Sequence, residues 1–246
     1  LDVAGSSSVS FAKVSDSDAL VGKPIIAIDS TDGQNNVNWT FISAVRPGAE
    51  ITWKSTAVSS DWSDAYNWVD ENGDNRIPVE TDHVTIPAGS ANCPVLSAAT
   101  TVAKLTVPSG ATFGSGGFDL TVTNKLTVAG TLNFGGAEKL SLLGDADLSG
   151  ATMPRSPAEV VLGGDALQTV DFDGHAFTKV TLANTTVGTA AKLIGGFSTK
   201  WLYCEQADAM RTYQFEPGRT VTVTGELRLK GASGANAMLG LASVTD

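Results

Sequence analysis

The fold is decided by Lys104-Leu105-Thr106-Val107 and Lys125-Leu126-Thr127-Val128, the two clearest copies of a pattern that recurs through the second half of the chain. In most copies an apolar residue at the second and fourth positions flanks a Thr or Ser, which is the period-two alternation of a half-buried strand. The other copies begin at Lys139, Glu159, Lys179, Lys200 and Thr220. Apart from the shorter step between Lys125 and Lys139, the copies follow one another at intervals of about 20 residues.

A repeat of about 20 residues with one dominant strand is typical of one coil of a β-solenoid, in which strands stack in parallel about 4.8 Å apart. The sequence therefore predicts an all-β parallel β-helix. The shorter step, which contains Gly135-Gly136, indicates a shortened coil or a corner. An immunoglobulin-like sandwich is the alternative, but it gives no reason for one motif to keep its phase six times. The side chains expected to point inward in successive coils are Leu105, Leu126, Leu140, Val160, Val180 and Val221.

Composition excludes several classes of function. The 246 residues contain 42% hydrophobic and 17% charged residues, and the formal net charge is −10. An acidic chain is a poor partner for nucleic acid, and no apolar run approaches the roughly 20 residues that cross a bilayer. We therefore expect neither nucleic-acid binding nor membrane insertion. Cys93 and Cys204 are too few for a disulfide framework, and they are expected either as free thiols or as one bridge.

A Trp-rich segment precedes the repeat and contains Asp61-Trp62, Asn67-Trp68, Ile77-Pro78, Asp82 with Val84 and Ile86, and Cys93-Pro94-Val95-Leu96. This series resembles the first segment of large, repetitive bacterial cell-surface proteins of the parallel β-helix, filamentous-haemagglutinin-like and adhesin type. The resemblance implies a right-handed solenoid and an extracellular or cell-surface location. It specifies turns and core positions rather than chemistry.

The resemblance also implies the domain organisation. Val9-Ser10-Phe11 and the stretch from Asp32 to Phe41 resemble closing coils of a preceding unit, and Tyr213 to Gly225 resembles late coils. The expected parts are closing coils at residues 1–45, a Trp-rich opening or cap segment at 46–100, and solenoid coils at 101–246. In this order the last coil of one copy would continue into the first coil of another. We therefore expect other copies of the unit as head-to-tail partners, either in a covalent tandem array or as separate subunits.

One candidate catalytic cluster is Asp171, Asp173 and His175, whose alternate spacing would place all three on one face of a strand. Asp173-Gly174 is also a turn motif, and a turn there would separate the three side chains. His83, the only other histidine, is interpreted as an exposed strand residue. The sequence therefore predicts no catalytic centre.

A candidate calcium loop lies at Asp70, Asn72 and Asp74, whose oxygens alternate along the chain. The EF-hand pattern fails, because Asn75 stands at the glycine position and Thr81 at the position of the closing Glu. A simpler surface site completed by backbone oxygens or Asp64 and an Asn-Gly hairpin tip both remain open. Calcium is the one cofactor that the sequence allows.

Trp62, Tyr66 and Trp68 are candidates for stacking on sugars, and the alternative is that they cap the end of the solenoid core. The function expected from all these features is a structural or adhesive repeat unit of a bacterial cell-surface or extracellular filament, stacking end to end. A polysaccharide-degrading β-helix enzyme and a carbohydrate-binding module, with surface glycans as ligands, are the alternatives. An enzyme would need ionisable side chains that converge in a groove, whereas a scaffold would scatter them.

Overall fold

The computed structural model describes residues 1–3, 9–22, 24–42, 48–205, 209–231 and 239–244. In chain order its elements are β1 (Val9–Ser10), β2 (Lys13–Val14), β3 (Ile25–Ile28), β4 (Thr31–Asp32), β5 (Trp39–Ile42), β6 (Glu50–Trp53), the 3-10 helix η1 (Ala65–Asn67), β7 (Trp68–Asp70), β8 (His83–Thr85), β9 (Thr100–Val107), β10 (Thr112–Gly114), β11 (Leu120–Val128), β12 (Thr131–Asn133), β13 (Lys139–Leu142), β14 (Asp145–Asp147), β15 (Glu159–Leu162), β16 (Gln168–Asp171), β17 (Ala176–Leu182), β18 (Gly188–Ile194), β19 (Phe197–Glu205), β20 (Arg211–Phe215), β21 (Val221–Lys230) and β22 (Leu239–Ser243). Within the described part of the chain, no helix is long and apolar enough to span a membrane.

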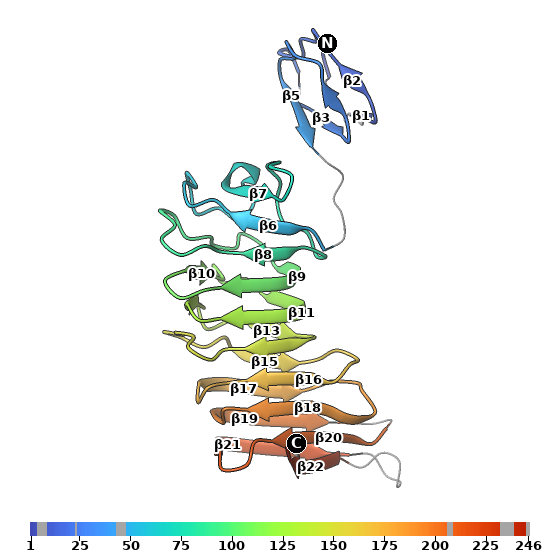
Figure 1. The fold of residues 1–246 in the computed structure, drawn as a ribbon. Coiled ribbons are helices and arrows are strands. Elements are labelled where there is room, and N and C mark those ends of the chain that lie inside the picture. Colours follow the sequence, from blue (N-terminus) through green and yellow to red (C-terminus); the bar gives the residue numbers. More distant parts are fainter. Residues whose placement is uncertain (4–8, 23, 43–47, 206–208, 232–238, 245–246) are drawn as a thin grey trace.

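The strands from β6 onward stack as a parallel β-solenoid, with the antiparallel pair β6–β7 at its upper end (Figure 1). Leu105 pairs with Leu126, and Val160 pairs with Val180, so that each strand lies against its counterpart one repeat later in the sequence. One face of the solenoid follows the order β11-β13-β15-β17-β19-β21, and a second follows β11-β14-β16-β18-β20-β22. The predicted all-β parallel solenoid is therefore confirmed, and so is its coil length.

The shorter step between Lys125 and Lys139 is a change of face and not a shortened coil. Leu126 pairs with Ala146, whereas Leu140 pairs with Leu120, and the sequence separation is the same in both pairs. The coil keeps its length, but the Leu-rich motif passes from the second face to the first. β11 is long enough to contribute to both faces, with a register shift between Val122 and Lys125.

Alternating side chains of both faces fill one continuous apolar core. Leu105, Leu126, Leu140, Val160 and Val180 are each 0% exposed, as predicted. Val221, the sixth predicted member, is only half-buried because it lies on β21, at the edge of the stack. Five of the six predicted core positions are thus fully inside, and the exception is at an end.

Residues 1–42 form a smaller set of parallel coils. β1, β3 and β5 make one ladder and β2 and β4 make another. Val9 pairs with Ala27, so the coil is only slightly shorter than those of the main solenoid. Residues 1–45 were expected to be closing coils of a preceding unit; the described strands there pair in parallel, and the expected boundary at 45 lies outside the described residues.

Candidate functional site

The most distinctive surface of the molecule is the C-terminal end of the solenoid. β21 and β22 each have one neighbour, β19 and β20 respectively, and their other edges are unpaired within the described part of the chain. An unpaired parallel strand presents a row of N–H and C=O groups that another strand can pair with. The two edges lie side by side at the bottom of Figure 1, on the two faces of the same core.

Inward-facing columns that are buried in earlier coils become exposed at this end. Cys204 on β19 is 0% exposed, whereas Leu229, its partner on β21, is 36% exposed. Tyr213 on β20 is 0% exposed, whereas Leu241, its partner on β22, is 52% exposed. These leucines occupy core positions, but the described residues cover them only in part.

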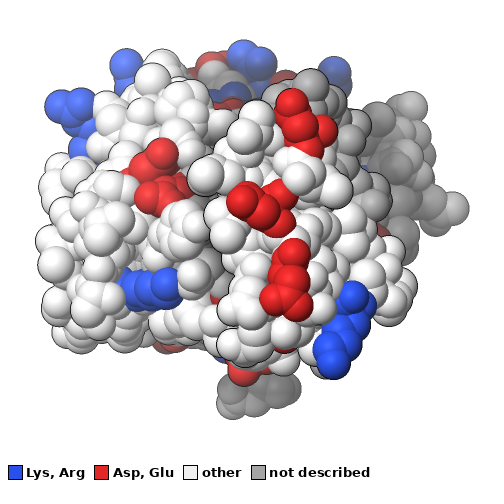
Figure 2. Space-filling view, turned by 90° about the horizontal axis from the view of Figure 1, so that it is seen from above, with Lys and Arg blue, Asp and Glu red and all other residues white. Residues whose placement is uncertain are grey.

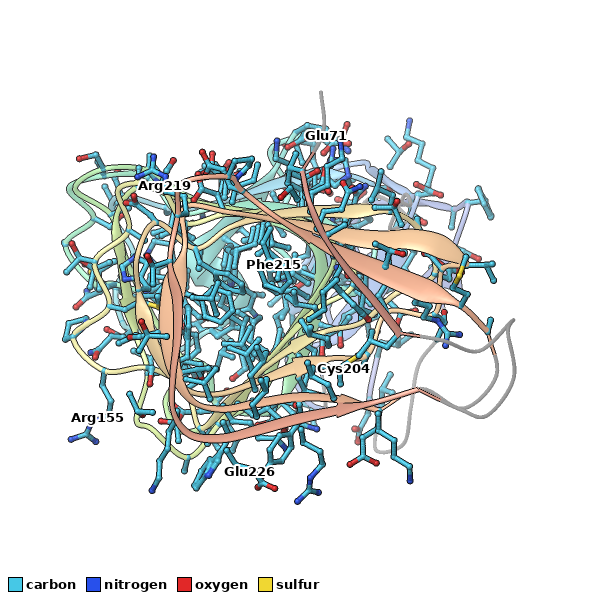
Figure 3. All side chains as sticks on the ribbon, turned by 90° about the horizontal axis from the view of Figure 1, so that it is seen from below. Glu71, Arg155, Cys204, Phe215, Arg219 and Glu226 are labelled. Carbon is cyan, nitrogen blue, oxygen red and sulfur yellow. The ribbon has the colours of Figure 1, made fainter. Side chains whose placement is uncertain are left out.

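Between the two edges lies an apolar hollow of about 280 Å³. Figure 3 looks up into this end and shows Phe215 inside the core and Arg219 at its rim, while Glu226 points outward. The hollow is lined by Leu182, Leu202, Phe215, Arg219, Val221, Val223, Leu227, Leu229 and Leu241. Its chemistry suits apolar side chains of another coil, and its one ionisable lining residue is Arg219.

The opposite end of the solenoid is closed by three buried indoles. Trp53 and Trp68 meet edge to face with ring centroids 4.8 Å apart, and Trp62 meets Trp68 at 4.5 Å. The indole N–H of Trp53 donates to the Asn92 carbonyl at 2.7 Å, and that of Trp68 donates to the Trp62 carbonyl at 2.8 Å. Both donors are thus satisfied inside the cap.

This burial corrects the prediction of a sugar-stacking surface. Trp62 and Trp68 are 4% and 0% exposed, so a glycan cannot reach their faces. Tyr66 is 68% exposed, but neither of the two indoles is exposed with it. The cap alternative is the one that the geometry supports.

In the predicted calcium loop, the carboxylate of Asp70 is engaged by other groups of the chain. It is buried against Arg76, with Nε 3.2 Å from Oδ2, and its Oδ1 accepts the N–H groups of Asn72 and Asp74. Arg76 binds Asp82 as well, with Nη1 to Oδ2 at 2.6 Å and Nη2 to Oδ1 at 3.0 Å. The hydrogen bond to Asp82 raises the pKa of Arg76. The loop is therefore an ion-paired part of the cap, and among the described residues no three acidic, His or Cys side chains are grouped as a metal site.

The candidate catalytic cluster is divided by a corner between β16 and β17. Asp173 and Gly174 have φ values of 46° and 76°, and the His175 N–H closes the turn on the Phe172 carbonyl at 2.9 Å. Asp171 accepts the N–H of Asp173, and Asp173 accepts the N–H of Gly150. Both carboxylates thus hold backbone at a corner, as the turn alternative predicted. His83 lies on β8 and contacts Glu50, with Nδ1 2.7 Å from Oε1.

A second hollow, of about 550 Å³, lies beside the cap. Its lining includes one ionisable side chain, Glu80. Hydrolysis of a glycosidic bond ordinarily uses a pair of carboxyl groups. This hollow therefore lacks the pair that the enzyme alternative needs.

Sequence reasoning missed a buried carboxylate at another corner. Glu138 is 1% exposed and accepts hydrogen bonds from the Ser115 hydroxyl and from the N–H groups of Gly135 and Ala137. Burial alone would raise the pKa of Glu138, but these hydrogen bonds outweigh it and lower the pKa to about 2. The sequence indicates that the nearby Gly135 is a turn residue. It does not indicate that Ser115, from the preceding coil, is a hydrogen-bond partner of Glu138.

Sequence reasoning also missed an outward-facing aromatic pair on β19. Trp201 and Tyr203 are half-buried, and their rings lie against cations, with Lys200 Nζ 4.5 Å from the Trp201 centroid. Tyr203 has Lys179 Nζ at 4.9 Å and the Arg228 guanidinium carbon at 4.7 Å, and its hydroxyl donates to Glu226 at 2.6 Å. A cluster of outward-facing aromatic and charged side chains thus lies on β17, β19 and β21.

The remaining candidates are structural. Cys93 and Cys204 are both free thiols, and burial raises the pKa of Cys204 to about 11. The Asn184 amide of the sequon Asn184-Thr185-Thr186 is buried and donates to the carbonyls of Gly163 and Ala166 and to Gln168. It is therefore not accessible for glycosylation.

Comparison with known proteins identifies no relative. No protein-family profile matches the sequence, and no curated protein and no solved structure is significantly similar to it. The arguments for function therefore rest on the geometry of this chain.

Proposed function

We propose that this chain is a structural unit of a bacterial cell-surface or extracellular filament, and that its solenoid continues through the C-terminal end. The observation that supports this most strongly is the asymmetry of the two ends of the core. One end is sealed by Trp53, Trp62 and Trp68, whereas the other leaves Leu227 and Leu241 more than half exposed. The extracellular setting follows from the resemblance to repetitive bacterial surface proteins.

The hydrogen bonds and ion pairs of five carboxylates support a passive role. The Asp171, Asp173 and Glu138 carboxylates hold backbone corners, and Asp70 and Asp82 are paired with Arg76. These groups position the chain rather than face a common cleft. A rod built from such coils would act as a long, stiff scaffold rather than as a catalyst.

The test is the assembly state of the whole chain. The double variant L227K/L241K places two charges on the exposed end of the core, and T222K/A242K adds the same charge to outward-facing, exposed positions of the same two strands. Light scattering should show concentration-dependent association for the parent and for T222K/A242K, but not for L227K/L241K. A parent that stays monomeric, or a core-end variant that associates as the parent does, would overturn the proposal.

Glycan adhesion is the second candidate, and it rests on Trp201 and Tyr203. An aromatic pair flanked by Lys179, Arg228 and Glu226 combines stacking faces with hydrogen-bonding groups on one sheet face. Binding of the chain to a glycan array, lost in W201A and kept in Y66A, would support this candidate. Equal binding by the parent and W201A would contradict it.

A further inference from the structure

The end formed by β21 and β22 is the surface that lacks a partner in the part of the chain that the structure describes. The identity of that partner is inferred below, and the inference rests on the proposed function. A further coil would cover Leu227 and Leu241 and would pair with both free edges. It must therefore supply two parallel strands and inward-facing apolar side chains. The cap of another copy does not fit, because its outermost strand β7 is antiparallel to β6 and its indoles are already covered.

We propose that the partner is the first coil of a second copy of this chain, presented through its strands β1 and β2. These strands each pair with one neighbour, β3 and β4, so both have a free edge among the described residues. Val9 is in register with Ala27, which is 0% exposed, yet Val9 itself is half-buried. An inward-facing side chain of the first coil is thus incompletely covered, as in the last coil.

Strand direction and coil length agree with this pairing. In both regions successive coils pair in parallel, and the sequence separation of Val9 from Ala27 is close to that of Val160 from Val180. Placing β1 and β2 on the free edges of β21 and β22 therefore continues the ladder without a change of direction. The junction would be parallel like the contacts between successive coils, but shorter, because β1 and β2 have two residues each and β21 and β22 have ten and five.

Charge favours the same partner. Residues 1–42 contain five Asp and two Lys and no Arg or Glu, whereas residues 211–243 contain three Arg and one Lys against two Glu. The last coil is thus net positive in a chain whose total charge is −10, and the first unit is net negative. Figure 2, viewed from the end that carries residues 1–42, shows acidic side chains across the middle of the surface and most Lys and Arg toward its edge. Opposite charge steers the two ends toward each other.

Residues 1–42 of the same copy do not supply this partner. Residues 1–42 lie beyond the cap in Figure 1, at the end of the molecule opposite to β21 and β22. Eight strand spacings separate β6 from β22 along the ladder, which is roughly 38 Å at about 4.8 Å each. The contact is therefore head to tail, and it propagates in one direction.

The test mixes two blocked variants of the full chain. The head is blocked by S10P. The Phe11 N–H donates to the Ile28 carbonyl on β3, so the N–H of the preceding Ser10 points the other way, toward the free edge of β1. Proline removes that donor. The tail is blocked by L227K/L241K. Sedimentation should show each variant alone at the chain mass of 25.3 kDa and the equimolar mixture at twice that mass. S10A and T222K/A242K are the matched controls and should assemble as the parent does.

A mixture that remains monomeric overturns the head-to-tail contact. If S10P alone assembles as the parent does while L227K/L241K is monomeric, the C-terminal end accepts a different partner. In that case this inference fails and the proposed function stands. Circular dichroism of each variant separates loss of contact from loss of fold, and a misfolded S10P is replaced by V9K, which places a charge on the unfinished core of the first coil.

Discussion

Arg76 and Asp82 form a buried, two-bonded ion pair, with Nη1–Oδ2 at 2.6 Å and Nη2–Oδ1 at 3.0 Å. Asp82 is 0% exposed, and its Oδ2 also accepts the Val79 N–H at 2.8 Å. This pair joins two points of the connection between β7 and β8, the second of them directly before β8. It explains why Asp70, which shares Arg76, is unavailable to a cation.

Removing one member of this pair should destabilise the cap strongly. R76A leaves Asp70 and Asp82 buried without their cation, and breaking a buried ion pair costs about 3 to 5 kcal/mol. We expect urea unfolding to show a loss of that size for R76A. R228A, which breaks exposed pairs with Glu205 and Glu226, should cost less than about 1 kcal/mol. Equal losses in the two variants would contradict the account of the cap.

Truncation of a core leucine should depend on its coil. Leu140 is 0% exposed and lies in the middle of the stack, so L140A should lower the free energy of unfolding by about 2 to 4 kcal/mol through the cavity it leaves. Leu227 has the same inward orientation but is 55% exposed, so L227A should cost under about 1 kcal/mol in the monomer. Chemical denaturation at low protein concentration measures both. A large loss for L227A under those conditions would show that the monomer itself covers this end.

Stability should fall in acid through Glu138. Its pKa is lowered from 4.5 to about 2 in the folded chain, so its contribution is complete above the unfolded pKa and is lost as the pH falls toward 2. A shift of this size corresponds to about 3 kcal/mol. The free energies of unfolding of the parent and of E138Q should therefore differ most above pH 5 and converge near pH 2. A difference that does not change with pH would contradict the hydrogen-bonded carboxylate described here.

Polysaccharides should not be cleaved by this chain. Asp171 and Asp173 each accept a backbone N–H at the corner between β16 and β17, and Asp147, which is in register with Asp171 on the neighbouring strand, accepts the Ser149 N–H in the same way. Reducing-sugar and unsaturated-product assays on neutral and acidic polysaccharides should give background rates for the parent and for D173N alike. Activity in the parent that disappears in D173N would establish the enzyme alternative.

Periodicity predicted the solenoid because every coil buries apolar side chains at the same positions of the repeat. The inward positions of Leu105, Leu126, Leu140, Val160 and Val180 follow from the alternation alone. The alternation misled only where the register slips. Lys179 pairs with Trp201 rather than with Lys200, so Leu202 points inward and Trp201 and Tyr203 point outward, the reverse of the pattern expected for that motif.

The candidate sites were harder to predict, because their partners come from other coils or from turns. Asp70, Asn72 and Asp74 have the spacing of cation ligands, but Arg76 folds back onto Asp70 and closes the site. Glu138 lies next to Lys139 in an ordinary glycine-rich corner, and its partner Ser115 belongs to the coil before it. Nothing in the local sequence distinguishes such a buried carboxylate from an exposed one.

The central claim is that the end formed by β21 and β22 is an unfinished core that binds another coil. Hydrogen exchange measured by mass spectrometry, at increasing concentrations of the full chain, tests it most directly. The account predicts that amides in residues 221–230 and 239–243 become protected as the concentration rises, while those in the cap at residues 49–70 do not change. Protection that is independent of concentration, or that increases at the cap instead, would contradict the claim.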